Sequence, residues 1–136
     1  MASRFTEIVV DCNDPLVLAR FWADVLGYHV VDEEGDYIEI APYESEPADL
    51  HDRMREAPPV PTIVFGLVPE GKAVKNRLHI DVRPTDRTTA EEVERILALG
   101  ATRADVGQTG DESWTVLADP AGNEFCVLRS ILELPR

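Results

Sequence analysis

The strongest constraint on the fold is a pattern of predicted elements that occurs twice along the chain. In the first half, an alternating strand over residues 5–12 leads into an amphipathic helix that ends before Gly27. In the second half, an alternating strand over residues 77–83 is followed by a helix that ends before Gly100. Three further strand-like segments follow each helix, so the predicted order is β-α-β-β-β in both halves. One such module cannot cover both faces of its own sheet, so we expect the two modules to pair around a shared interior.

Capping and turn residues set the ends of the predicted helices. Asp14 can cap the first helix, and Pro15 suits its first position because the missing N–H would be unpaired there anyway. Thr88 or Thr89 can cap the second helix, which is predicted to run to residue 99. Alternation and turn signals predict the remaining strands, at residues 28–32, 37–41, 62–68, 101–106, 113–117 and 124–128.

The first helix is predicted to pack through a single apolar stripe. Apolar residues recur there at helical spacing, which is typical of a helix that covers one face of a sheet. We expect the stripe to consist of Leu16, Ala19, Phe21, Trp22, Val25 and Leu26. Phe21 and Trp22 are therefore predicted to belong to the core.

Residues 42–61 interrupt the repeat in the first half. This stretch contains five of the ten prolines and many charged residues, with a predicted short helix at residues 48–55. Long irregular segments are uncommon in compact domains and are often functional. We interpret residues 1–136 as a single domain, with one module at about 4–68 that carries this insert and a second at about 76–130.

Composition excludes some classes of partner. The net charge is −13 and no cluster of Lys or Arg offsets it, so a nucleic-acid backbone would be repelled. No apolar run approaches the roughly 20 residues that span a bilayer. The first residues lack the apolar core of a signal peptide, so we expect a cytoplasmic location. Cys12 and Cys126 lie in apolar strands, and in that compartment they are expected to be buried thiols rather than a disulfide.

The strand at residues 77–83 has an unusual polar face. Its apolar positions alternate with polar ones, and the polar ones are Arg77, His79, Asp81 and Arg83. An ordinary solvated strand would favour Thr, Lys or Glu. The pattern fits a strand that lines a wet cavity, and it also fits a surface strand that carries these residues without a function.

Other predicted strands offer polar residues on one face in the same way. Glu7 shares a face with Asp11 on the first strand, and Glu124 shares a face with Cys126 on the last. If these faces line the interior, they supply contacts for a bound molecule. The candidate ligand-binding residues are Asp11, Tyr37, Arg77, Asp81, Trp114 and Glu124.

Three motifs resemble the vicinal oxygen chelate superfamily, which includes glyoxalase I, bleomycin-resistance proteins and extradiol dioxygenases. The first is Asp14-Pro15, followed by the Phe-Trp pair of the helix and Leu-Gly-Tyr at its end. The second is Lys-Asn-Arg-Leu-His-Ile-Asp at residues 75–81, and the third is Asp-Pro-Ala-Gly-Asn-Glu-Phe at residues 119–125. The chain is most similar to the glyoxalase-like domain group. The resemblance implies an α+β fold in which two βαβββ modules pair around a shared cavity, and it specifies no reaction.

The resemblance also implies a site. Metal-dependent members bind a divalent ion through the first and last strands of each module, and the first-strand positions fall on Glu7 and His79. The last-strand position, normally a glutamate, falls on Cys126, and its counterpart near residues 65–67 offers no ligand. Glu7 and His79 are thus the implied catalytic pair and, with Cys126, the implied ligands of Zn, Ni, Mn or Fe. A protein without metal is equally compatible, with Glu7 paired to Arg77, His79 hydrogen-bonded in a polar cleft and Cys126 in the core.

Two functions of different classes follow from the resemblance. One is a divalent-metal-dependent lyase, isomerase or dioxygenase-type enzyme that acts on a small oxygenated molecule. The other is a binding protein that sequesters a small molecule without metal, as drug-resistance members do. The incomplete ligand set favours binding, and the retained Glu7 and His79 favour chemistry. We expect a small-molecule-binding glyoxalase-like protein, which the resemblance also predicts to be a homodimer.

Overall fold

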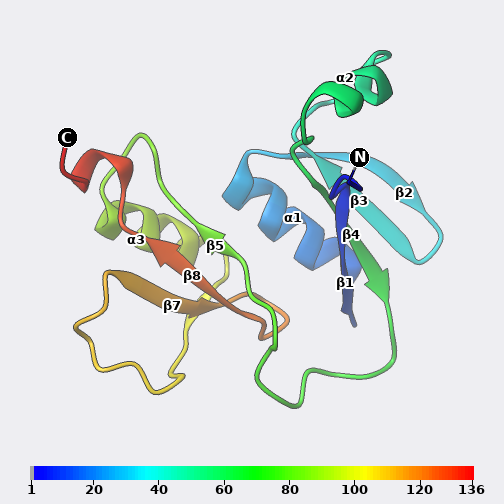
Figure 1. Cartoon of the computed structure of the whole chain (residues 1–136). Coiled ribbons are helices and arrows are strands. Elements are labelled where there is room, and N and C mark those ends of the chain that lie inside the picture. Colours follow the sequence, from blue (N-terminus) through cyan, green and yellow to red (C-terminus); the bar gives the residue numbers. More distant parts are fainter. Residues whose placement is uncertain (1) are drawn as a thin grey trace. The chain divides into compact units, whose positions relative to one another are not determined.

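The computed structural model describes residues 2–136, and the chain divides into two compact units, residues 1–71 and 72–136. Unit 1 contains a four-stranded sheet in the order β1-β4-β3-β2, in which β1 and β4 are parallel (Figure 1). The α1 helix packs against β3 and β4 of this sheet. The elements of unit 1 are β1 (Glu7–Cys12), α1 (Pro15–Leu26), β2 (His29–Glu34), β3 (Tyr37–Ala41), α2 (Leu50–Glu56) and β4 (Thr62–Leu67).

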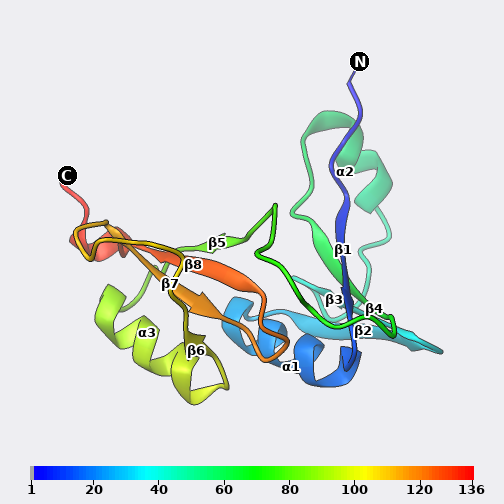
Figure 2. The same cartoon turned by 90° about the horizontal axis from the view of Figure 1, so that it is seen from below.

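Unit 2 repeats this arrangement. Its sheet has the order β5-β8-β7-β6, again with the first and last strands side by side and parallel (Figure 2). The α3 helix packs against β8. The elements of unit 2 are β5 (Asp81–Val82), α3 (Thr89–Ala98), β6 (Thr102–Arg103), β7 (Trp114–Ala118), β8 (Glu124–Leu128) and a short 3-10 helix (Ile131–Glu133).

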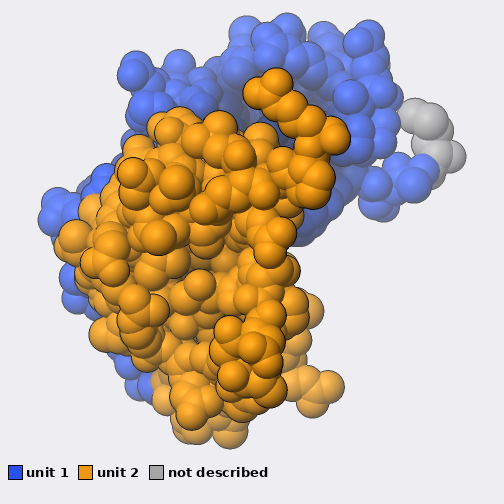
Figure 3. Space-filling model, turned by 90° about the vertical axis from the view of Figure 1, so that its left-hand side faces the viewer, with its two compact units in different colours: residues 1–71 blue, residues 72–136 orange. Residues whose placement is uncertain are grey.

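The two units, coloured separately in Figure 3, therefore share one topology. In each, one helix follows the first strand, three strands come after it, and the last strand pairs in parallel with the first. The predicted α+β fold with two βαβββ modules is confirmed. The α2 helix lies within the insert of unit 1, close to the predicted range.

The helix ends form as the capping residues predict. The Asp14 side chain accepts a hydrogen bond from the Val17 N–H at 3.2 Å, and Gly27 ends α1 with a φ of 68°. A residue with a Cβ is strained in that left-handed conformation, so glycine suits the position. At α3, Thr88 accepts from the Glu91 N–H while the Glu91 side chain accepts from the Thr88 N–H, which is a complete capping box.

The apolar stripe of α1 differs from the prediction at its N-terminal end. Leu18 is only 1% exposed, whereas Leu16 is 36% exposed. Two residues correspond to about 200° around a helix, so only one of these side chains can face the sheet. Packing against β3 and β4 selects Leu18, together with Ala19, Phe21, Trp22 and Ala23. The predicted burial of Phe21 and Trp22 is confirmed, and their rings meet edge to face with centroids 5.3 Å apart.

Two predicted strands are much shorter than expected. The strand predicted at residues 77–83 pairs with β8 only over Asp81–Val82, and Leu78 is 88% exposed. The strand predicted at residues 101–106 is reduced to Thr102–Arg103. Alternation marks residues that can form a strand, but a ladder also needs a neighbouring strand of matching length. In the observed register Asp81 pairs with Cys126 and Val82 with Val127, and most of the alternating segment stays outside the ladder.

Both cysteines are buried, as expected, and neither forms a disulfide. No helix among residues 2–136 is long and apolar enough to cross a membrane.

The α1 packing leads to a matched pair of substitutions. Leu18→Ala should lower the free energy of unfolding by about 2–5 kcal/mol, because it leaves a cavity under the helix. Leu16→Ala removes the same atoms from an exposed position and should cost less than about 1 kcal/mol. Urea denaturation followed by circular dichroism measures both. Equal losses in the two variants would contradict the packing described here.

Candidate functional site

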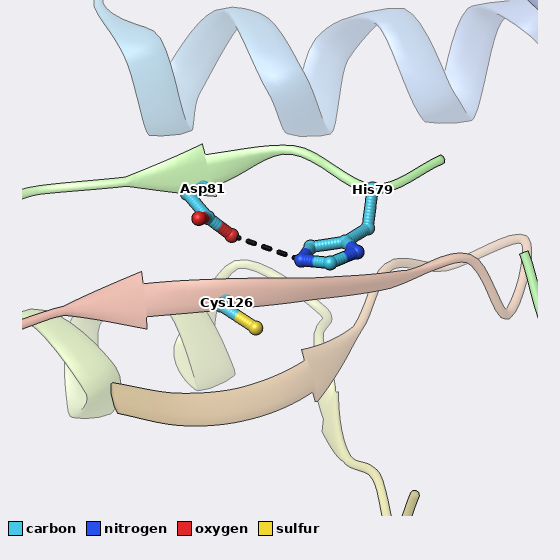
Figure 4. A group of neighbouring side chains, drawn as sticks. All are labelled: His79, Asp81 and Cys126. Atoms are coloured by element: carbon cyan, nitrogen blue, oxygen red, sulfur yellow. Dashed lines mark ion pairs between the residues drawn. The ribbon is translucent and has the colours of Figure 1, made fainter. Parts of the chain in front are cut away.

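Three possible metal ligands of unit 2 lie together, and we call them the donor group: His79, which precedes β5, Asp81 of β5 and Cys126 of β8. The parallel register of β5 and β8 places Asp81 directly beside Cys126. His79 precedes Asp81 by two residues, and Figure 4 shows the three side chains gathered on one side of these strands. The His79 Nε2 lies 3.2 Å from the Asp81 Oδ1. The imidazole nitrogen, the carboxylate oxygen and the thiol sulfur all lie within 4.8 Å of one another.

The donor group combines a buried thiol with two half-exposed side chains. Cys126 is 9% exposed, while the side chains of His79 and Asp81 are 44% and 46% exposed. Burial raises the pKa of the Cys126 thiol, and the negative charge of Asp81, to which the thiol donates a hydrogen bond, raises the pKa further. Cys126 is therefore a neutral thiol near pH 7 in the absence of an ion.

The spacing of the donor group fits a divalent ion. An ion bound at about 2.0–2.3 Å by N, O and S ligands keeps those atoms roughly 3.3–3.8 Å apart in tetrahedral geometry. The observed separations of up to 4.8 Å need an adjustment of about 1 Å. The half-exposed His79 and Asp81 side chains can make this adjustment by rotation. A set of N, O and S donors suits zinc or another borderline ion.

A cavity of about 330 Å³ lies beside the donor group and is formed entirely by unit 2. Apart from the donor group, its lining is mostly apolar and includes Trp114, which is 44% exposed. The other lining residues are Lys75, Val106, Val116, Glu124, Phe125 and Leu128. The cavity thus has an apolar wall and one polar region that contains every member of the donor group.

Glu124 is fully engaged by its own chain. Its Oε1 accepts from Lys72 Nζ at 2.8 Å, and its Oε2 accepts from the Asn76 N–H at 3.1 Å. The two side chains of this ion pair are only 15% and 18% exposed. Hydrogen bonding from Lys72 lowers the pKa of Glu124 to about 2. Glu124 therefore stabilises the segment that leads to His79, and its predicted contact with a ligand stays a prediction.

The two motifs of unit 2 that carry the family resemblance contact each other. The Asn76 side chain donates to the Asn123 Oδ1 at 3.1 Å. Asp119 in turn accepts from the N–H groups of Ala121 and Asn123, which fixes the turn between β7 and β8. The turn and the segment that carries His79 are therefore linked by hydrogen bonds.

Glu7 lies in unit 1 and lines a different cavity of about 280 Å³. Other polar residues there are Glu39, Tyr43 and His51, and α2 contributes Leu50 and Met54. Glu39 accepts a hydrogen bond from the Thr62 hydroxyl at 2.9 Å. The predicted pairing of Glu7 with His79 joins residues of two units and stays a prediction.

The remaining predicted residues are not members of the donor group. Asp11 and Tyr37 both lie next to Gly66 of β4, where an added Cβ would be 3.4 Å from the carboxylate and 3.2 Å from the ring. Tyr37 is 59% exposed, and Arg77 is also exposed. Arg77 forms no ion pair within the part of the chain that the structure describes. The sequence interpretation assigned Asp81 to ligand binding, although its spacing of two from His79 already indicated a shared face.

The sequence matches the family model described as "Glyoxalase-like domain" over residues 7–128. The chain belongs to this family. The predicted resemblance to the vicinal oxygen chelate superfamily is thereby confirmed. No curated protein matches this glyoxalase-like protein significantly.

Several solved structures share the fold of this chain. A glyoxalase/bleomycin resistance/dioxygenase family enzyme from Burkholderia phytofirmans PsJN is 17% identical, with a TM-score of 0.61 and coverage of 95% of this chain and 99% of that one. The fosfomycin resistance protein FosX from Listeria monocytogenes, complexed with Mn(II) and 1S,2S-dihydroxypropylphosphonic acid, is 15% identical, with a TM-score of 0.66 and coverage of 98% and 94%. The oxidase ChaP-H2 is 19% identical, with a TM-score of 0.60 and coverage of 95% and 94%. At these identities the likeness shows a common fold.

The engagement of Glu124 generates a prediction about stability and pH. Because the folded state holds the pKa of Glu124 at about 2 instead of 4.5, its contribution is complete above pH 4.5 and is lost as the pH falls towards 2. Glu124→Gln should lower the free energy of unfolding at pH 7 by about 1.5–3 kcal/mol, the range for hydrogen bonds to charged groups. It should also flatten the dependence of stability on pH between 4.5 and 2. Urea denaturation at several pH values measures both effects.

Asp111→Asn is the matched control, since Asp111 is an exposed carboxylate of unit 2. It should leave the stability and its pH profile within about 0.5 kcal/mol of the wild type. A Glu124→Gln variant that behaves like this control would refute the described role of Glu124.

Proposed function

We propose that this glyoxalase-like protein binds a small molecule in the unit 2 cavity, with a divalent metal ion held by the donor group at the wall of that cavity. The supporting observation is the convergence of one nitrogen, one oxygen and one sulfur donor within 4.8 Å beside an apolar cavity of about 330 Å³. The FosX neighbour is complexed with Mn(II) and a small phosphonic acid, which is consistent with this proposal.

The cavity favours a ligand with an apolar body and at least one polar oxygen. Val106, Trp114 and Leu128 offer apolar surface, and Trp114 can stack on a flat group. Lys75 is the one lysine or arginine among the described lining residues, and its ammonium can bind an oxygen of the ligand. The donor group lies in the same lining, so a ligand held by the apolar wall brings its polar end towards His79 and Asp81.

A bound ion supplies Lewis-acid chemistry, since it polarises a ligand oxygen and favours loss of a neighbouring proton. His79 and Asp81 are half exposed, so each can contact a ligand as well as the ion. With His79 bound to the ion, the Asp81 carboxylate has a second oxygen that can accept a proton from the ligand. We include a lyase, isomerase or dioxygenase-type reaction in the proposal on these grounds.

Binding without metal is the second candidate function, and one observation favours it. The Cys126 thiol donates to Asp81, and Asp81 also lies within hydrogen-bond distance of His79. The Asp81 carboxylate thus interacts with both the thiol and the imidazole. A sequestering protein could keep this polar cluster as part of the cavity wall.

Several other expectations from the sequence remain predictions, among them the role of Glu7 as a ligand or base, the homodimer and the cytoplasmic location. The metal proposal is made on unit 2 alone and does not depend on them.

His79→Ala tests the metal proposal. Protein prepared without a polyhistidine tag should bind about one equivalent of zinc, by elemental analysis after dialysis. His79→Ala should weaken binding more than about 100-fold, because loss of a direct ligand exceeds the 10–100-fold cost typical of an outer-shell partner. His51→Ala is the matched control, since His51 is an exposed histidine of unit 1, and it should bind like the wild type.

The opposite result separates the two functions. If neither the wild type nor the variants bind Zn, Ni, Mn or Fe(II) after incubation, the metal part of the proposal is wrong. Binding of a small molecule would then be the function to pursue.

Trp114→Ala tests the cavity. A screen for small oxygenated aromatic and aliphatic compounds that raise the melting temperature should find ligands of the wild type. Trp114→Ala should weaken a ligand found in this way by at least about fivefold, equivalent to about 1 kcal/mol of lost stacking and apolar contact. Phe5→Ala, which removes an exposed aromatic ring from unit 1, should leave the affinity unchanged. Equal affinities in all three proteins would place the ligand outside the unit 2 cavity.

A further inference from the structure

We propose that Cys126 makes the unit 2 site selective for thiophilic divalent ions, with Zn(II) strongly preferred over Mn(II). This inference rests on the proposed function, because it concerns the same donor group. It goes further in assigning the choice of metal to one side chain.

The position of Cys126 in the sheet fixes its sulfur beside the other donors. β8 lies between β5 and β7, so Cys126 has Asp81 on one side and Val116 on the other. A strand paired on both sides cannot shift its side chains to the opposite face without breaking its ladder. At 9% exposure the thiol is largely shielded from water, and its sulfur lies within 4.8 Å of the donor atoms of His79 and Asp81.

The carboxylate of β8, Glu124, is not available to replace the sulfur. Glu124 precedes Cys126 by two residues, so the two side chains lie on the same face of the strand. Both of its carboxylate oxygens are occupied, one by the Lys72 ammonium at 2.8 Å and the other by the Asn76 N–H at 3.1 Å. Freeing Glu124 would break an ion pair whose side chains are 15% and 18% exposed and leave Lys72 without this partner. The site therefore offers N, O and S donors, and not the N, O and O donors that a second carboxylate would give.

This donor set separates metals by their chemistry. Thiolate ligands bind zinc and other soft or borderline ions well, whereas carboxylate and water suit Mn(II). Zinc already binds most sites more tightly than manganese, and a sulfur donor widens that difference. Three protein ligands also leave a coordination position for a ligand atom, which agrees with the half-exposed His79 and Asp81.

The experiment compares metal affinities of the wild type, Cys126→Ser, Cys126→Asp and Cys12→Ser. Metal-free, tag-free protein is titrated with Zn(II) and Mn(II) in competition with a chromophoric chelator. Co(II) is added separately, because a thiolate bound to Co(II) gives an intense charge-transfer absorption in the near ultraviolet. Cys12→Ser is the matched control, since Cys12 is the buried thiol of unit 1.

We expect the wild type and Cys12→Ser to show the charge-transfer band and a zinc affinity far above their manganese affinity. Cys126→Ser should lose the band and bind zinc about 100-fold more weakly, with manganese affinity changed less than about fivefold. Cys126→Asp should lose the band and bind manganese more tightly than the wild type does. Circular dichroism checks that each variant is folded, and the wild-type band alone keeps the test valid if a Cys126 variant does not fold.

The outcomes distinguish this inference from the proposed function. Zinc bound by the wild type without a charge-transfer band, and equally by Cys126→Ser, overturns the inference and leaves the metal site in place. Failure of every protein to bind any of the three metals overturns the proposed metal site itself.

Discussion

Unit 2 depends on the contacts that β8 makes with the chain before β5. The backbone ladder between these two strands covers only Asp81–Val82, with one additional hydrogen bond from the Cys126 N–H to the Ile80 carbonyl at 3.0 Å. Side chains extend this short attachment, because Glu124 accepts from both Lys72 and the Asn76 backbone. These contacts bring together segments about fifty residues apart, and the donor group exists only because they do.

The same arrangement explains why the polar residues of unit 2 differ in chemical character. Glu124 is held as a carboxylate by an ammonium and a backbone N–H, which lower its pKa to about 2. Cys126, two residues later, is buried and lies beside the Asp81 carboxylate. Burial and this negative charge both raise the pKa of its thiol. Two side chains on one face of one strand thus have opposite electrostatic environments. One is committed to structure, and the other is left facing the cavity with His79 and Asp81.

Much of the fold was predictable because it depends on local sequence. Asp14 and Thr88 cap their helices through contacts within three residues, and Gly27 supplies a left-handed φ that its own lack of a Cβ allows. The order of elements in each unit follows from periodicity in the same way. Parts of the site were also predictable from the sequence, since His79 and Cys126 were predicted to lie on strand faces that line a cavity. Their roles as ligands remain predictions, as does the shared interior of the two modules.

The sequence by itself determined the duplicated βαβββ order, the helix caps and the alternation that gives each strand a polar and an apolar face. All of these depend on residues a few positions apart. Only the tertiary structure decided that the alternating segment at residues 77–83 forms a strand of two residues, that α1 buries Leu18 instead of Leu16, and that Lys72 pairs with Glu124. Each of these depends on which distant neighbour is present to pair or pack. The local sequence pattern limits which secondary structure a segment can form. The distant segment that pairs or packs with it decides which residues enter the strand or become buried.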